Sequence, residues 1–440
     1  MSSVAEDKMK MVEGLVKSLP HAPLSQMEQA LMSVTDDSLL RVRLMVTHEL
    51  MRRQLKERIF KVYLPLFEHR EDELNGVIFP KWLLDNMWLS LNERQAGLID
   101  KALAALSVPD PEVALEPILP KLIEDCLSVV TTQAQSLLPQ HPRKNDINEI
   151  NDFKAFLEAY KPICEGVSQL PEWRAHLDDE KTYKLKVLYK SARQINDLGG
   201  VAFFETLFSH MADGSQVLKL ITLATNLTEE AYLAQSDLSD FGLRLIERIE
   251  ETIEAVRQKG RLSLTKQAQL ASHALGYMQL FDTYIKFSKD GPWNIRMMNI
   301  RRTIGKVMEE KLKAAEKTLD KTFPTEKVRG LLIIKTEVAP DLQPIEDSIE
   351  AIQFILAIRA NASVGGFSTQ HTKVLGHLET KLSGWLDELL FVVNNTDDFN
   401  PDIMREYFRC LAELQRAQMG NEGAAMIMRR MNTSKLVLKQ

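Results

Sequence analysis

His48, His210 and Asp178 are the residues of this chain whose side chains are best suited to acid–base or metal chemistry. His48-Glu49 begins like the zinc-binding pattern HExxH, but Arg52 stands where the second histidine would be needed. His48 also lies within an apolar stripe, which is more typical of a core histidine. Asp178 precedes a helical stripe, where a carboxylate suits the positive end of the helix dipole. An enzyme would therefore have to assemble its site from distant helices.

Compact catalytic and cofactor-binding motifs are missing from the sequence. It has no GxxxxGK[ST] phosphate loop, no GxGxxG after a strand and no GxSxG nucleophile elbow. The three cysteines show no CxxC spacing, which argues against a disulfide framework or a zinc site. His371 and His377 would diverge by about 120° on a helix and would chelate one metal poorly. The sequence predicts no cofactor and no metal, and favours a non-enzymatic protein over an enzyme.

Apolar residues recur at the spacing of amphipathic helices along nearly the whole chain. The longest stripe lies in a predicted helix from Trp293 to Phe323. Its apolar positions are Met297, Ile300, Ile304, Met308, Leu312, Ala315 and Leu319. A second predicted stripe contains Leu44, Met51, Leu55, Ile59, Val62 and Leu66. Because such helices are stabilised by burying one face against others, most of them are expected to pack on two or more neighbours.

Short sequence patterns also predict where some helices begin and where a turn lies. Capping-box patterns, in which a Ser or Asp precedes a Glu by three residues, predict helix starts at Ser25, Ser90 and Asp146. The pair Gly199-Gly200 predicts a tight turn between helices, followed by a core helix whose apolar residues begin at Phe203.

Strand signals are scarce. Only the segment from Gly330 to Val338 looks extended, and it is expected to be irregular or to pair locally. The predicted fold class is all-α, either a multi-helix bundle or an irregular α-solenoid, with this one short extended segment. Turn-rich breaks divide the chain into an N-terminal helical region (1–138), a central one (146–322) and a C-terminal one (345–440).

Charge is distributed unevenly along the chain. Basic residues dominate from Arg41 to Lys61, and no acidic residue occurs from Arg296 to Lys306 or from Gly423 to Gln440. The segment from Thr336 to Ala357 holds five acidic residues and no Lys or Arg. Such blocks mark either interaction surfaces or faces that pair with one another inside the fold.

Methionine accompanies the basic charge near the C-terminus, and methionine-rich surfaces accept varied partners. A basic amphipathic helix also suits a partner's groove. The residues predicted to bind a partner are Arg296, Arg301, Arg302, Met426, Met428, Arg429, Arg430 and Met431.

The formal net charge of −6 argues against a dedicated nucleic-acid coat. The sequence shows no signal peptide and no apolar run near the ~20 residues of a membrane-spanning helix, so a cytoplasmic protein is expected. The favoured function is a non-enzymatic helical scaffold, adaptor or regulator that binds another protein. The alternatives are a nucleic-acid-associated regulator that uses basic helical faces, and an all-α enzyme. The identity of the partner and the oligomeric state stay open.

Overall fold

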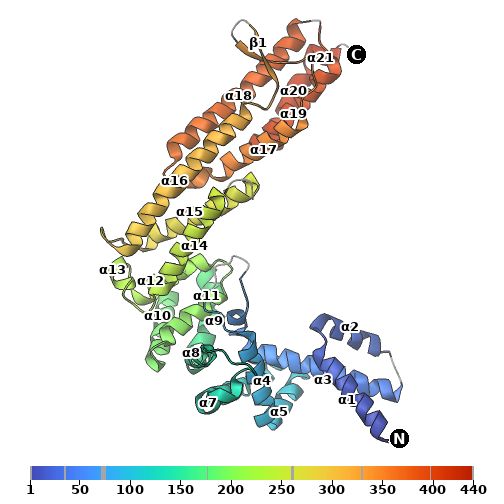
Figure 1. Ribbon diagram of the computed structural model, residues 1–440, viewed down its shortest axis with the longest axis vertical. Coiled ribbons are helices and arrows are strands. Elements are labelled where there is room, and N and C mark those ends of the chain that lie inside the picture. The colour runs from blue at the N-terminus through green and yellow to red at the C-terminus, as the bar shows by residue number, and fades with distance from the viewer. Residues whose placement is uncertain are drawn as a thin grey trace. The chain divides into compact units, whose positions relative to one another are not determined.

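The computed structural model describes residues 2–33, 36–70, 76–175, 177–258, 262–328, 331–396 and 398–438. Over these residues the predicted all-α fold is confirmed, and one two-stranded hairpin is the only sheet (Figure 1). The chain divides into two compact units, Met1–Asn226 and Leu227–Gln440. The finer sequence-based division into 1–138, 146–322 and 345–440 stays a prediction. Among the helices of the described ranges, none is long and apolar enough to span a bilayer.

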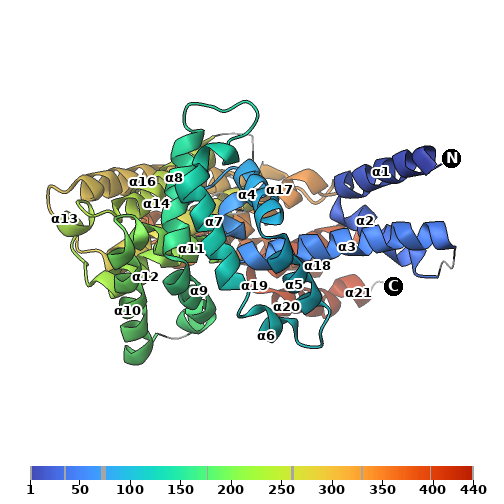
Figure 2. The same ribbon diagram turned by 90° about the horizontal axis from the view of Figure 1, so that it is seen from below.

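The first unit is built from helices alone in its described part. In chain order they are α1 (Ser2–Ser18), α2 (His21–Leu31), α3 (Asp37–Phe60), η1 (Leu64–Phe67), α4 (Lys81–Arg94), α5 (Ala96–Leu106), α6 (Pro111–Leu115), α7 (Leu119–Gln133), η2 (Ala134–Leu137), α8 (Asp146–Glu158), α9 (Tyr160–Ala175), α10 (Asp179–Ile195), α11 (Gly199–Ser209), η3 (Gly214–Gln216) and α12 (Val217–Thr225). Helices α1, α2 and α3 pack around Val16, Leu24 and Val46 (Figure 2).

The apolar stripe predicted for α3 is partly wrong. Its first half buries Val46 against α1 and α2, and Val42 and Leu50 pack beside it. Leu44 and His48 are each two positions from Val46, which turns them by about 200° to the opposite side of the helix. Leu44 is therefore 69% exposed, and His48 is exposed rather than a core histidine.

Two of the three capping-box predictions are wrong as well. Ser25 and Ser90 lie inside α2 and α4, whose starts follow Pro20 and Pro80 without a side-chain cap. A proline can precede a helix in this way because its fixed φ suits the entry. The third start is confirmed, since α8 begins at Asp146.

The core of the first unit has a prominent aromatic cluster. Phe153 is fully buried and packs edge-on against Tyr63, Phe67 and Phe79, with ring centroids 5.3, 5.4 and 4.8 Å away. The predicted core helix after the glycine pair is also confirmed, because α11 begins at Gly199. A Cβ at Gly199 would lie 1.9 Å from the carbonyl oxygen of Ala192, so this turn requires glycine.

The second unit combines long helices with the hairpin. Its elements are α13 (Glu230–Leu233), α14 (Ser239–Arg257), α15 (Leu264–Tyr284), α16 (Pro292–Leu319), β1 (Thr325–Val328), β2 (Leu331–Ile334), α17 (Leu342–Ala357), η4 (Arg359–Asn361), α18 (Ser368–Asn395), α19 (Pro401–Met419), α20 (Asn421–Asn432) and α21 (Lys435–Leu438). The longest predicted stripe is confirmed, because all seven of its apolar residues are buried along α16. Helix α16 packs against α14, α17 and α18, in line with the expectation of several neighbours per helix.

The extended segment expected near 330–338 is a strand over its described beginning. Leu331–Ile334 forms β2, which pairs antiparallel with β1, and Thr325 lies opposite Ile334. Gly330 lies outside the described residues. The strand β1 was not foreseen, and it supplies the local partner that β2 needs.

The start of α16 is held by a buried carboxylate. Glu230 is 0% exposed, and it accepts hydrogen bonds from the backbone N–H groups of Ser288 (2.9 Å), Trp293 (2.7 Å) and Asn294 (3.2 Å). A carboxylate at a helix N-terminus satisfies free N–H groups and matches the dipole. Glu230 thereby joins the short helix α13 to the 28-residue helix α16.

Candidate protein-binding site

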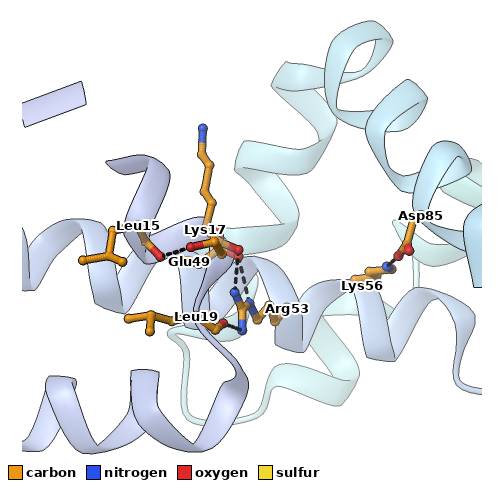
Figure 3. A network of polar contacts seen from close by, with 8 residues as sticks. Leu15, Lys17, Leu19, Glu49, Arg53, Lys56 and Asp85 are labelled. Carbon is orange, nitrogen blue, oxygen red and sulfur yellow. Dashed lines mark hydrogen bonds and ion pairs between the residues drawn. The ribbon is translucent and has the colours of Figure 1, made fainter. Parts of the chain in front are cut away.

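The basic stretch from Arg41 to Lys61 lies along α3, where neighbouring groups engage much of its charge. The guanidinium of Arg53 donates to the Glu49 carboxylate at 2.8 Å. It also donates to the carbonyl oxygens of Leu19 and Lys17, at 2.8 and 3.1 Å, near the end of α1 (Figure 3). Carbonyls at a helix end lack partners in their own helix, so Arg53 fastens α1 to α3.

Two more cations of this stretch join α3 to other helices of the first unit. Lys56 pairs with Asp85 of α4, as Figure 3 shows. Arg58 pairs with Glu112 of α6, with 2.5 Å between Nη1 and Oε1. Lys56 and Arg58 therefore hold helices together, and the carboxylates of Asp85 and Glu112 already neutralise part of their charge.

The basic start of α16 is also partly paired. Arg296 makes two hydrogen bonds to Glu250 of α14, at 3.1 and 2.7 Å. Arg301 pairs with Asp282 of α15. Arg302 is exposed and forms no ion pair with any residue of the described ranges. The structure therefore places two of these three predicted partner-binding arginines in contacts between helices of the second unit.

The methionine-rich segment forms helix α20, which packs antiparallel on α19. Met431 faces this packing and is only 9% exposed. Met426 and Met428 are half-buried, whereas Arg429 and Arg430 are exposed. Their role in binding a partner stays a prediction, and four of the five predicted residues of this segment reach solvent.

The residues suited to acid–base chemistry have local structural roles. Asp178 is the N-cap of α10 and accepts from the N–H of Lys181 at 2.9 Å, so the helix-start interpretation is confirmed. His210 contacts the carbonyl oxygen of Val62 through Nε2 at 2.7 Å. In the described part of the chain, no three His, Cys, Asp or Glu side chains are grouped so as to hold a metal ion.

His210 is expected to make the stability of the first unit depend on pH. Burial lowers the pKa of His210 below its ordinary value, and the charge of Lys61 lowers it further against the raising effect of the Val62 hydrogen bond. The unfolded chain therefore takes up this proton at higher pH than the folded one. The stabilisation is complete above the unfolded pKa of about 6.5 and is lost as the pH falls from there through the folded pKa.

Urea denaturation of the wild type and of His210→Gln at about pH 7.5 and about pH 5.5 checks this expectation. The glutamine keeps a donor for the Val62 carbonyl but does not titrate. The variant is expected to lose less stability than the wild type on acidification. An equal loss in both proteins would mean that His210 is not responsible.

A cavity of about 510 Å³ in the first unit is bordered largely by polar groups. Its lining residues are Trp82, Asn86, Leu89, Ser90, Glu93, Arg94, Gln133, Ser136, Leu138, Pro139 and Gln140. Arg94 donates to Gln133 at 3.0 Å, and Asn86 donates to the carbonyl of Leu137 at 2.8 Å. Part of its polar lining is therefore already engaged in contacts within the unit.

A different cavity lies in the second unit, between β2 and α18. It also has a volume of about 510 Å³, but its walls are mainly apolar. Its lining residues are Ile333, Ile334, Thr336, Asp387, Glu388, Leu389, Phe391, Val392 and Thr396. We name this cavity the acidic groove, because Asp387 and Glu388 are the only charged residues in its described lining. Phe391 is 64% exposed at its edge.

One wall of the acidic groove is fixed by Glu388. Lys335 donates its N–H to the carbonyl of Pro324 at 2.8 Å, so the alternating ladder turns the N–H of Ile334 away from β1. The Glu388 carboxylate accepts that N–H at 3.1 Å. Glu388 thus replaces a neighbouring strand at the outer edge of β2, and it sets the distance between strand and helix.

Tyr407 of α19 fixes the segment that follows β2. The single proton of its hydroxyl is shared between the carbonyl oxygens of Lys335 (3.0 Å) and Val338 (2.9 Å). Burial raises the pKa of Tyr407 to about 12, so the hydroxyl keeps its proton and remains a donor. The acidic groove is therefore largely formed before any ligand binds.

The acidic block of the sequence begins at the groove. Thr336 lines the groove, and Glu337 follows it in the chain. All five acidic residues from Glu337 to Glu350 are exposed, and none pairs with a Lys or Arg within the described ranges. Glu337 therefore adds an exposed carboxylate next to the groove, whereas Lys335, which lies between the lining residues Ile334 and Thr336 in the chain, adds a cation.

Sequence reasoning named the parts of this site separately and did not join them. The extended segment, the acidic block and the apolar run from Leu389 to Val393 were each visible. Five consecutive apolar residues on a helix cannot all face one core, because successive residues turn by about 100°. Exposure of Phe391 was therefore predictable in principle, whereas its position opposite β2 depends on tertiary contacts.

The chain was compared with models of protein families, with curated proteins and with solved structures. None of the three comparisons found a match.

Proposed function

We infer that this chain is a cytoplasmic, non-enzymatic protein that binds another protein through the acidic groove. The groove would receive an apolar side chain from a positively charged segment of the partner. The observation that carries this proposal is a largely preformed apolar cavity of about 510 Å³ whose described lining contains two carboxylates and no other charged residue. Preformed apolar cavities with a few placed polar groups are typical binding sites.

The chemistry of the lining supports binding over catalysis. In the described part of the lining, neither carboxylate is accompanied by a His, Cys or Lys, and Glu388 accepts the N–H of Ile334. The alternative of nucleic-acid association has less support, because Arg296 and Arg301 are paired with Glu250 and Asp282. An amphipathic helix with basic flanks matches the apolar walls and the two carboxylates of the lining.

A labelled model peptide tests the proposal. The probe is an amphipathic helix of about 18 residues, or ~27 Å, made of Leu and Lys, and its control replaces every Lys by Glu. Fluorescence anisotropy is expected to show binding of the Lys peptide and not of the Glu peptide. Binding should weaken with added salt, because exposed charges are screened.

Phe391→Ser is expected to weaken binding of the Lys peptide about tenfold, the effect of removing an apolar anchor worth about 1.4 kcal/mol. Phe391 is exposed, so its loss leaves the fold intact. The matched control is Ile295→Ser, which removes an apolar side chain that is 50% exposed on α16. Equal affinity of the wild type and Phe391→Ser, or equal binding of the two peptides, would overturn the proposal.

A further inference from the structure

We propose that the acidic groove selects a flat aromatic side chain from its partner, and that Glu388 sets this preference. The inference rests on the proposed function, because it names the kind of side chain that the same site receives. Glu388 acts through the position of β2, and it is therefore a positioning residue.

The width of the groove at Glu388 follows from one hydrogen bond between helix and strand. The carboxylate of Glu388 accepts the backbone N–H of Ile334 at 3.1 Å. An extended glutamate side chain places its carboxylate oxygen about 5 Å from its own Cα, because each carbon–carbon bond is about 1.5 Å long. The Cα of Glu388 and the nitrogen of Ile334 are therefore at most about 8 Å apart.

A gap of this width accepts one layer of atoms. Carbon atoms in contact lie about 3.5–4.0 Å apart, so a layer that touches both walls needs about 7–8 Å. A flat aromatic ring is one layer thick. A branched side chain or a puckered ring is thicker, and forcing it between fixed walls is unfavourable. Beside Glu388 the groove is therefore a slit that suits an aromatic ring.

An exposed ring lies at the edge of this slit. Phe391 follows Glu388 by three residues, which places the two side chains on neighbouring parts of the α18 surface. The Phe391 side chain is 64% exposed. Aromatic rings attract one another edge to face, so a ring that enters the slit gains a further contact there.

Glu388 determines the width because it joins β2 directly to α18. In the described ranges it makes the only hydrogen bond between these two elements. Other hydrogen bonds hold the strand to different elements, because β2 pairs with β1 and the hydroxyl of Tyr407 in α19 holds the chain after the strand. Without the Glu388 acceptor, β2 is free to move away from α18, and the slit loses its fixed width.

The neighbouring carboxylate has a different role. Asp387 is exposed, and one residue along a helix turns a side chain by about 100°. Asp387 therefore faces solvent at the groove and attracts the cation of the partner, whereas Glu388 faces the strand. Two adjacent residues thus respond to charge and to shape, and substitutions at the two positions are expected to differ in effect.

Two labelled Lys-containing helical peptides test the inference on the full chain. Their apolar residues are phenylalanine in one peptide and cyclohexylalanine in the other. The saturated ring has as many carbon atoms as the aromatic one, but it is puckered and thicker. It is also more apolar, so burial alone would favour it. Fluorescence anisotropy is expected to show that the wild type binds the phenylalanine peptide about tenfold more tightly.

Two variants of Glu388 separate positioning from the filling of space. Glu388→Gln keeps a carbonyl acceptor for the Ile334 N–H, so its preference for phenylalanine is expected to stay at about tenfold. Glu388→Leu has a similar size but no acceptor, and its preference is expected to fall to about threefold or less. Phe391 is unchanged in both variants, so contact with its ring cannot explain a difference between them.

Hydrogen exchange of the Ile334 amide reports the position of β2 without any peptide. Exchange is expected to become faster in Glu388→Leu and to stay slow in Glu388→Gln. Asp387→Asn is the matched control at the neighbouring position. It is expected to bind both peptides less tightly and to keep the wild-type ratio between them. Circular dichroism of each variant confirms that its helices are intact.

Equal or tighter binding of the cyclohexylalanine peptide by the wild type overturns the slit. A preference that survives in Glu388→Leu, or Ile334 exchange that does not change there, overturns the role of Glu388. In either case the proposed function stands if the phenylalanine peptide binds and a version with every Lys replaced by Glu does not. If neither Lys-containing peptide binds the wild type, the proposed function fails together with this inference.

Discussion

Replacement of Glu230 by alanine is expected to lower the free energy of unfolding of the second unit by about 3 kcal/mol. The carboxylate is fully buried and accepts three backbone N–H groups, those of Ser288, Trp293 and Asn294. Each buried donor left without a partner costs about 1–3 kcal/mol, and water entering the space offsets part of the sum. The helix dipole also loses its nearby negative charge.

Urea denaturation, followed by the intrinsic fluorescence of Trp293 and the other tryptophans, measures this loss. Glu230→Gln keeps one carbonyl acceptor and is expected to lose less. Glu229→Ala is the matched control, because its side chain is exposed and belongs to the same turn. If Glu230→Ala and Glu229→Ala unfolded at the same urea concentration, Glu230 would not anchor α16.

Replacement of Phe153 by alanine is expected to destabilise the first unit by about 4 kcal/mol, within the range for deletion of a buried phenylalanine ring. Phe153 is 0% exposed and packs edge-on against Tyr63, Phe67 and Phe79. These rings come from α8, from η1 and from the chain on either side of it. The lost ring would leave a cavity at the point where these segments meet.

Thermal and urea denaturation of Phe153→Ala check the size of this effect. Tyr183→Ala in α10 is the control, because it removes an aromatic ring that is 70% exposed in the same unit. The control is expected to change stability by less than about 0.5 kcal/mol. Loss of stability in Phe153→Ala no larger than in Tyr183→Ala would show that the aromatic cluster is not a core.

Periodicity predicted the helices well where one face of a helix is buried along its whole length. Helix α16 is such a case, because its stripe from Met297 to Leu319 packs on the neighbouring helices throughout. Helix α3 is not, because its first half packs on α1 and α2 and its second half on α5 and α7. Different sides are buried in the two halves, so a single stripe through Leu44 was wrong.

The pattern of charges in the sequence could not distinguish cations that pair within the fold from cations that stay exposed to solvent. Arg53, Arg296 and Arg301 have partners that come from other helices or from the preceding turn, and pairing across helices follows from the tertiary fold. The arginines of α20 have no such partners in the described part of the chain. Sequence reasoning therefore found the basic blocks, and the structure distinguishes those that hold helices together from those that face solvent.

The acidic groove depends on one contact that no local pattern encodes. Glu388 bonds the N–H of Ile334, a residue 54 positions earlier in the chain. The alternation of the hairpin makes that N–H point outward, and the sequence left local pairing as one of two possibilities without identifying β1 as the partner. The residues of the groove were visible in the sequence, but their assembly was not.

Photo-crosslinking tests most directly whether the acidic groove is the binding site. A Leu/Lys peptide that carries one benzoylphenylalanine in place of a leucine is irradiated with the full chain, and the attachment points are mapped by mass spectrometry. The expected crosslinks lie on α18 between Asp387 and Thr396 and on β2 and the residue pair after it, from Ile333 to Thr336. Crosslinks confined to other surfaces, or spread evenly over both units, would contradict binding at the groove.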